Sequence, residues 1–92
     1  MDDERRIRLR DKDLAWRALE NEVVVLDLRT SMYLSVNQTG ALLWTRLVNG
    51  ATEEELVSVL LDAFDVGQER AHADVAGFLA ICTDRNWLEP AG

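Results

Sequence analysis

The sequence predicts an α+β domain in which a three-stranded antiparallel sheet is followed by three helices. Residues 14–36 are rich in β-branched and aromatic side chains, broken twice by short turn-forming segments. From residue 37 onward the apolar residues recur at helical spacing. A chain of 92 residues is long enough for one compact core but not for two. Strands followed by helices imply that the helices pack on one face of a small sheet.

Composition and charge narrow the class of protein. Apolar residues make up 48% of the chain and charged residues 29%, as in soluble globular proteins. A net charge of −7 argues against a nucleic-acid partner, since phosphate binding needs clustered Lys and Arg. No apolar run approaches the ~20 residues that span a bilayer, and the charged start lacks the apolar core of a secretion signal. We therefore expect a cytoplasmic protein with no nucleic-acid or membrane partner.

Residues 1–13 form a charged N-terminal arm before a domain at residues 14–90. Acidic residues at positions 2–4 precede five basic residues between Arg5 and Lys12. Such a mixed-sign run is typical of a solvated segment, and the alternative is a contact surface for an acidic partner.

The three predicted strands cover residues 14–19, 22–27 and 32–36. The connections, at residues 20–22 and 28–31, are short and rich in turn formers, so consecutive strands are antiparallel neighbours. The first and third strands are then outermost.

The second connection sets which side chains share a face of the sheet. A three-residue loop with Ser31 in the left-handed region would pair Leu26 with Leu34 and gather the apolar residues on one face, and this register is preferred. A two-residue loop would instead pair Leu26 with Tyr33 and Val25 with Leu34, which splits the apolar residues between the two faces.

Capping patterns mark the helices. Residues 37–40 offer capping side chains for a first helix that ends at Asn49-Gly50. Thr52 and Glu55 have the T-x-x-E spacing of a capping box for the second. The third runs from about Gln68 to Arg85, after which Trp87 and Leu88 are expected to fold back and Pro90 to close the domain.

Catalytic chemistry is not indicated. Acid–base and nucleophilic catalysis need at least two cooperating side chains in one pocket. His72 is the only histidine and Cys82 the only cysteine, and we expect the first at the surface and the second as a buried inert thiol. No phosphate-binding glycine motif is present. We therefore predict no enzyme, no metal site and no cofactor.

The third strand is the feature that points to a function. Residues 32–36 contain no charge and no proline, although edge strands are usually protected by such residues. The edge is therefore open to a peptide that adds as an antiparallel strand. On the sequence alone, cover by a helix, a tail or a second copy is an equally good interpretation.

Several segments together resemble the PqqD-like family, the leader-recognition domains of pathways that modify ribosomally made peptides. They include Val25-Leu26-Asp27, the Y-L-x-x-N-x-T-G pattern that begins at Tyr33, and the D-V-x-x-F-L pattern that begins at Asp74. The similarity extends from about Leu14 to Pro90. Many relatives have Gly at the position of Ser31, and Gly-Leu is common at Asn86-Trp87.

The resemblance implies a winged-helix-like fold in which a precursor's leader peptide adds as a strand beside the third strand and lies against the third helix. The third strand would supply backbone pairing, and apolar and charged residues of the third helix would select leader side chains. The implied peptide-binding residues are Met32, Tyr33, Leu34, Ser35, Val36, Arg70, Ala71, Asp74, Val75, Phe78 and Arg85. Among them, Leu34, Val36, Val75 and Phe78 would line an apolar groove.

Within the family, the chain is most similar to the stand-alone leader-binding proteins of lasso peptide biosynthesis. This similarity implies a transglutaminase-like leader peptidase as partner, with a cyclase as a further one. An alternative is a peptide chaperone for a radical-SAM maturase. A winged-helix DNA-binding regulator is an alternative from a different class.

Overall fold

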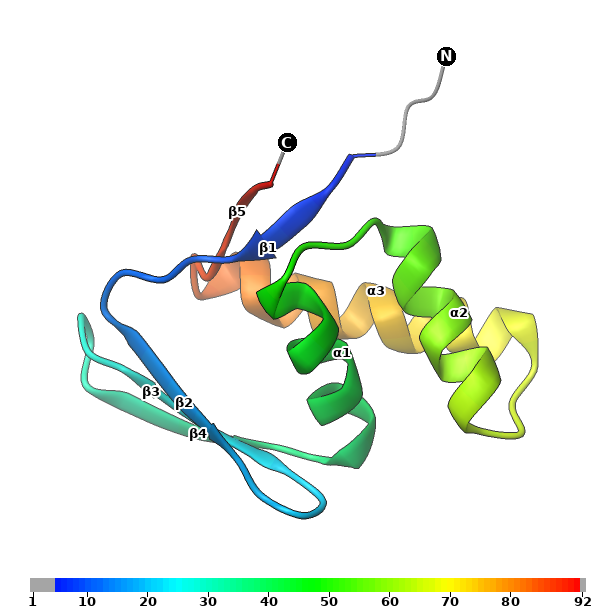
Figure 1. Ribbon diagram of the computed structural model, residues 1–92, viewed down its shortest axis with the longest axis horizontal. Helices are drawn as coiled ribbons and strands as arrows, with labels where there is room; N and C mark the ends of the chain where they lie inside the picture. The colour runs from blue at the N-terminus through cyan, green and yellow to red at the C-terminus, as the bar shows by residue number, and fades with distance from the viewer. Residues whose placement is uncertain (1–4, 92) are drawn as a thin grey trace.

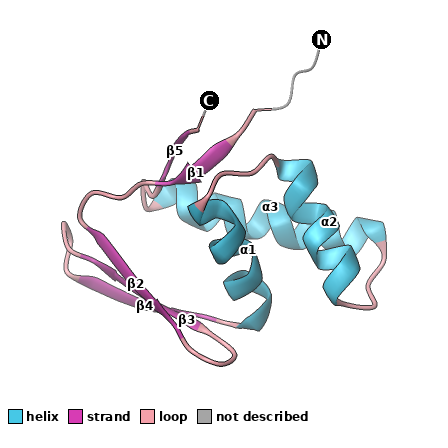
Figure 2. Ribbon diagram, viewed as in Figure 1, coloured by secondary structure: helices cyan, strands magenta, loops and turns pink. Residues whose placement is uncertain are grey.

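A computed structural model describes residues 5–91 and has the expected order of elements (Figure 1, Figure 2). Strands β2 (Leu14–Ala18), β3 (Val23–Asp27) and β4 (Met32–Val36) form an antiparallel sheet in the order β2-β3-β4. Helices α1 (Gln38–Val48), α2 (Glu53–Ala63) and α3 (Gln68–Asp84) follow. The predicted α+β class is confirmed, and the third predicted strand has the bounds of β4.

A second, two-stranded sheet was not predicted. β1 (Ile7–Leu9) pairs antiparallel with β5 (Leu88–Pro90), near the two ends of the described chain. Leu9 is only 5% exposed, so this part of the N-terminal segment belongs to the core. Arg8 Nε lies 2.8 Å from an oxygen of Glu89 across the strand pair. The acidic positions 2–4 lie outside the described residues.

The basic side chains in and around β1 explain why this strand was missed. Arg6 and Arg8 are exposed and each pairs with a carboxylate from elsewhere in the chain, Glu55 and Glu89 respectively. A three-residue strand that contains Arg8 and is flanked by Arg6 and Arg10 has little local β preference. Its pairing with residues about 80 positions later is a tertiary contact, which local sequence patterns do not reveal.

The register of β3 and β4 corrects the preferred prediction. Val25 pairs with Leu34 and Leu26 with Tyr33, as in the alternative register. Val23, Val25 and Asp27 therefore face the core, whereas Leu26 is exposed. The prediction was wrong because it assumed that only apolar residues face inward, and Asp27 is a buried carboxylate. Ser31 does adopt the left-handed region, with a φ of 61°.

The helix caps follow the sequence patterns. The Asn37 side chain accepts a hydrogen bond from the Gly40 amide at 3.0 Å, which begins α1. Gly50, with a φ of 94°, follows its end. Thr52 and Glu55 form the expected capping box of α2. These caps satisfy amides that would otherwise lack partners at the helix starts.

The core lies between the sheet and the three helices and holds α3 in place. α2 packs against one face of α3 there. Trp44 is fully buried and stacks edge-to-face on Trp87, with ring centroids 5.5 Å apart. Asn86, with a φ of 62°, makes the turn that folds Trp87 back under the end of α3. β4 and α3 are thereby fixed on either side of a gap.

Candidate functional site: a groove between β4 and α3

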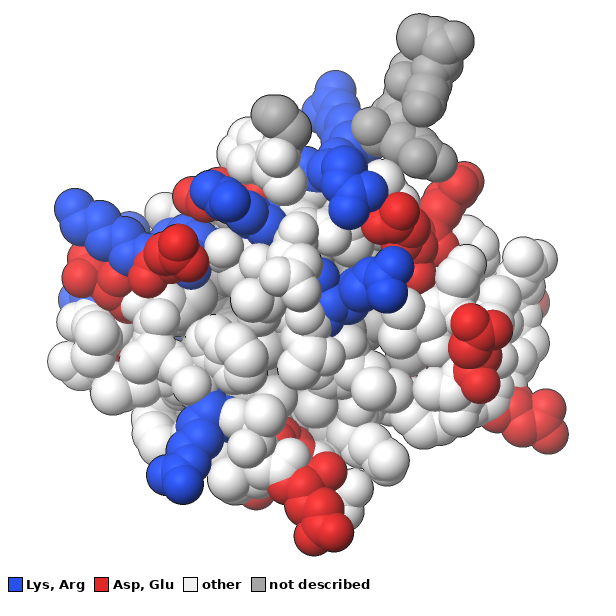
Figure 3. Space-filling model, in the orientation of Figure 1, with Lys and Arg blue, Asp and Glu red and all other residues white. Residues whose placement is uncertain are grey.

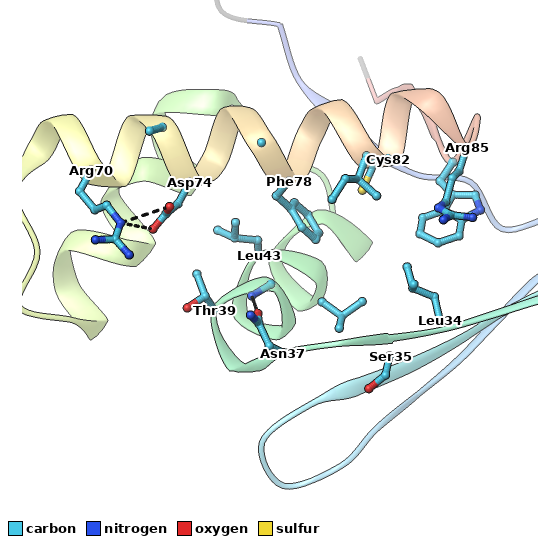
Figure 4. A pocket seen from close by; sticks show the side chains of 16 residues that line it. Leu34, Ser35, Asn37, Thr39, Leu43, Arg70, Asp74, Phe78, Cys82 and Arg85 are labelled. Atoms are coloured by element: carbon cyan, nitrogen blue, oxygen red, sulfur yellow. Dashed lines mark hydrogen bonds and ion pairs between the residues drawn. The ribbon is translucent and has the colours of Figure 1, made fainter.

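A groove of about 600 Å³ lies between β4 and α3 (Figure 4). Its walls come from β4 with the start of α1 on one side and from one face of α3 on the other. The residues that line it are Leu34, Ser35, Val36, Asn37, Thr39, Gly40, Leu43, Arg70, Ala73, Asp74, Gly77, Phe78, Ile81, Cys82, Arg85 and Trp87.

β4 is an edge strand beside this groove. In the described part of the chain it pairs with β3 alone, so one side of its backbone has no partner strand. Tyr33 is 67% exposed and Met32 is also exposed. An uncovered edge with free amides and carbonyls is a template for pairing with another strand. The described residues of this chain therefore leave the expected edge open.

The groove face of α3 is lined by small side chains at its centre. A Cβ atom added to Gly77 would meet no atom within 4 Å. Ala73 is exposed one turn before it, and Ile81 is 50% exposed one turn after it. Without large side chains here, the backbone of a bound chain can approach the helix closely.

Packing is tight where α1 begins. A Cβ atom on Gly40 would lie 2.4 Å from Val36 Cγ1 and 3.4 Å from Phe78 Cε1. Gly40 is therefore required for the close contact of α1, β4 and α3 at this point. Phe78 is partly buried and points from α3 toward the groove (Figure 4).

The charged side chains of the groove stand at its two ends. At one end Arg70 Nε lies 3.3 Å from Asp74 Oδ2, one turn along α3. At the other end the Arg85 guanidinium lies over the Trp87 ring, 5.7 Å from its centroid. The middle of the groove is apolar, so it suits a peptide with apolar side chains between polar ends.

A buried carboxylate fixes the Trp87 end of the groove. Asp27 is 2% exposed, and its Oδ2 accepts a hydrogen bond from Trp87 Nε1 at 2.9 Å. The other oxygen, Oδ1, accepts from the Arg29 amide at 3.0 Å and lies 3.5 Å from the Arg10 guanidinium. The Trp87 bond, with help from Arg29 and Arg10, holds the pKa of Asp27 below its ordinary value.

The structure brings together seven of the eleven implied site residues. The seven that line the groove are Leu34, Ser35, Val36, Arg70, Asp74, Phe78 and Arg85. Met32 and Tyr33 lie on the same strand outside it. Ala71 and Val75, in contrast, are fully buried. The expectation that Val75 lines the groove is therefore corrected, because its side of α3 faces the core.

Sequence reasoning missed the groove face of α3 itself. Ala73, Gly77 and Ile81 recur every fourth residue, which places them on one stripe of the helix. A glycine in a helix interior costs stability relative to alanine, and this cost is a sequence signal for a position where something approaches closely.

The groove carries no catalytic arrangement. Burial raises the pKa of the Cys82 thiol to about 12, so it stays protonated and unreactive at neutral pH. His72 is exposed on α3 and does not line the groove. Within residues 5–91 no three His, Cys, Asp or Glu side chains gather as metal ligands would. The arrangement is suited to binding an extended segment.

Two further properties bear on the class of partner. Acidic and basic side chains are interspersed on the face drawn in Figure 3, without a continuous basic surface. None of the described helices has the length and apolar character needed to cross a membrane.

The chain matches one family model and is similar to two solved structures. A family model described as coenzyme PQQ synthesis protein D (PqqD) matches residues 22–88. A solved structure titled "Lasso peptide synthetase B1 complexed with the leader peptide" has a TM-score of 0.78 and 25% identity, covering 91% of this chain and 98% of its own. A second, "TbiB1 in Complex with the TbiA(beta) Leader Peptide", has a TM-score of 0.81 and 24% identity, covering 92% and 98%. No curated protein sequence matches.

Proposed function

This chain belongs to the PqqD family, and from that membership we propose that it is a non-catalytic adaptor for the leader segment of a ribosomally made precursor peptide. The observation that carries the proposal is the apolar groove beside the uncovered edge of β4. The two similar solved structures support it, since each title names a complex with a leader peptide.

The leader would add to β4 as an antiparallel strand. Pairing with the β4 backbone provides affinity for any extended segment, and pockets for alternate side chains provide selectivity. Apolar leader side chains would enter the groove between Leu34, Val36 and Phe78. Met32 and Tyr33 would contribute backbone pairing, since they lie on the strand but outside the groove.

Binding to the leader is tested by fluorescence polarisation. The probe is the labelled leader of the precursor encoded beside this chain's gene. We expect saturable binding, strongly weakened by Phe78→Asp because a carboxylate then stands in the apolar middle of the groove. Ala76→Asp is the matched control, since Ala76 is exposed on α3 and does not line the groove. Absence of binding by the folded wild-type protein would refute the proposal.

Because Phe78 also packs against the core, a second variant separates binding from folding. Gly77→Gln adds a side chain in open space and replaces a glycine within a helix, so we expect a folded protein with a blocked groove. Circular dichroism checks the fold. Unchanged affinity of this variant would place the peptide elsewhere on the molecule.

Strand addition has its own test. N-methylation of alternate leader amides removes every second donor, and only one of the two sets points toward β4 in an antiparallel ladder. We expect one methylated set to bind far more weakly than the other. Equal affinity for both sets would rule out strand addition while leaving leader binding intact.

The partner that receives the leader is the final part of the proposal. We infer that the adaptor presents the precursor to a transglutaminase-like leader peptidase of lasso peptide biosynthesis, with a cyclase acting afterwards. The match to the model of a coenzyme PQQ synthesis protein supports a second candidate, delivery to a radical-SAM maturase. Pull-down with the products of the neighbouring genes distinguishes the two, because each predicts capture of a different enzyme.

A further inference from the structure

The groove has three charged lining residues, and among residues 5–91 only one of these three has no partner of opposite charge. Arg70 and Asp74 neutralise each other at 3.3 Å. Arg85, at the opposite end, has no carboxylate within 4 Å in the part of the chain that the structure describes. One end of the groove is therefore electrically neutral and the other is positive.

Arg85 is held in place although no acidic side chain among residues 5–91 pairs with it. Its guanidinium lies over the Trp87 ring, at 5.7 Å from the centroid. Stacking on an aromatic face leaves the N–H groups at the edge of the guanidinium plane able to donate. Figure 4 shows the side chain extending from the last turn of α3 toward β4, above Leu34. Little side-chain entropy is then lost when a ligand binds these donors.

The hydrogen-bond network beneath Arg85 fixes the Trp87 ring on which the guanidinium stacks. The carboxylate of this network, Asp27, is paired with other residues and not with Arg85. Trp87 is 1% exposed, and its Nε1 is bonded to Asp27. Asp27 is the nearest buried acid of this network, and its charge is already met by Arg10 at 3.5 Å, by Trp87 and by the Arg29 amide. The negative charge under the ring is thus satisfied by partners other than Arg85.

We propose that the Arg85 end of the groove binds the carboxylate of an Asp or Glu side chain in the captured peptide, and that this residue lies on the C-terminal side of the peptide's apolar anchor. The proposal rests on the proposed function and adds a charge preference and a direction to it. A planar guanidinium with free donors is the group that recognises carboxylates best in proteins.

The direction follows from the topology. Met32 is opposite Asp27 in the sheet, and Asp27 contacts Trp87, so the start of β4 lies at the Arg85 end. Gly40, after the end of β4, lies beside Phe78. β4 and α3 therefore run antiparallel. A peptide that pairs antiparallel with β4 runs from Arg70 toward Arg85, and meets the Phe78 region before Arg85.

The spacing follows from element geometry. Phe78 and Arg85 are seven residues apart on α3, a rise of about 10 Å. An extended chain covers this distance in about three residues. Since side chains that face α3 recur at every second residue, the acidic residue should stand two or four positions after the apolar anchor.

The test selects ligands from a phage-displayed library of random twelve-residue peptides. The full chain is used as wild type and as the matched variants Arg85→Gln and Arg70→Gln, each checked by circular dichroism. We expect wild type and Arg70→Gln to enrich an apolar residue followed two or four positions later by Asp or Glu. Arg85→Gln should keep the apolar preference and lose the acidic one.

Reversal of the charge at Arg85 tests the carboxylate site on a single peptide. On an enriched peptide, Arg85→Glu should weaken binding roughly tenfold or more, and exchange of the peptide's acidic residue for Lys should restore much of the loss. Arg85→Lys should retain the acidic preference, which separates a charge effect from a change in folding.

Failures of the two proposals are distinguishable. If no peptide is enriched by any folded variant, the proposed peptide binding itself is refuted. An apolar motif without an acidic position, or with one that Arg85→Gln leaves unchanged, overturns the carboxylate site alone. An acidic position that precedes the anchor overturns the antiparallel direction.

Discussion

The two faces of α3 differ in how they are covered, although both are made largely of small and apolar residues. One face, with Ala71 and Val75, is fully buried against the core. The other, with Ala73, Gly77 and Ile81, lines the groove and is open. Burial of the first face stabilises the fold. The second leaves apolar surface exposed, which is what a binding surface requires.

Burial is a property of what packs against a helix and cannot be read from its residues alone. Alanine stands on both faces, at Ala71 and at Ala73, with opposite exposure. The difference arises because α2 packs against one side of α3, while the other side faces an edge strand across a gap. Predictions that separate the two faces therefore test the site directly.

The largest expected difference between the faces is in their tolerance of a charge. Val75→Asp buries an unpaired carboxylate in the core and should lower the free energy of unfolding by several kcal/mol, enough to unfold a marginally stable domain. Ala73→Asp should leave folding within about 0.5 kcal/mol and act on peptide binding. Urea denaturation followed by circular dichroism measures both. Equal destabilisation would mean that the groove face is covered after all.

A smaller effect is expected from the two glycines that line the groove. Gly40→Ala forces a methyl group against Val36, 2.4 Å from its Cγ1, and should cost about 1–3 kcal/mol in overpacking. The measurement is the midpoint of thermal unfolding. A midpoint at or above that of wild type would show that this junction has more room than the structure gives it.

Gly77→Ala should change stability in the opposite direction. The added methyl group enters open space, and alanine in a helix interior is favoured over glycine by about 0.5–1 kcal/mol. We expect a higher unfolding midpoint together with weaker peptide binding if the peptide backbone approaches the helix here. A midpoint below that of wild type would contradict the open environment of this position.

The last effect appears only in acid and concerns the network beneath the groove. Because the pKa of Asp27 is lower in the folded protein than the ordinary aspartate value of 3.8, the unfolded chain takes up protons more readily. The stabilisation that the ionised Asp27 carboxylate provides is complete above about pH 5 and is lost as the pH falls through the folded pKa. Urea unfolding at pH 6 and pH 3, followed by tryptophan fluorescence, measures the loss.

The controls are variants of the two carboxylates with lowered pKa values. Asp27→Asn should unfold with a smaller difference between the two pH values than wild type. Glu55, in the capping box, also has a lowered pKa, so Glu55→Gln should remove a separate part of the acid effect. If Asp27→Asn shows the full wild-type difference, its network does not contribute in this range.

Local features were predictable where local chemistry decides them. Thr52 and Glu55 satisfy each other's amides within one turn, so the start of α2 could be identified from four residues. Ser31 in the left-handed region was likewise expected from the turn. At Asn86, a second position where relatives often carry glycine, the chain also has a positive φ. Asparagine tolerates this conformation better than most residues.

Features that depend on distant contacts were not predictable in this way. The inward position of Asp27 is stable only because Trp87, 60 residues later, donates a hydrogen bond to it. Without that partner, the apolar pattern alone favoured the wrong register. The burial of Val75 and the openness of Ala73 depend equally on which elements pack against α3. The unpaired edge of β4 could be predicted from the sequence, whereas the α3 wall of the groove at Ala73, Gly77 and Ile81 could not.

The pairing of β1 with β5 has a consequence for linking this domain to others. The Ala91 amide donates to the Arg6 carbonyl at 3.0 Å, so the two ends of the described chain are neighbours, at the side of α3 away from β4 (Figure 1). A short linker can therefore join them, and new termini can be opened in the β2–β3 turn without crossing the groove. A second protein fused at either end would be held near a bound peptide at high effective concentration while the groove stays accessible.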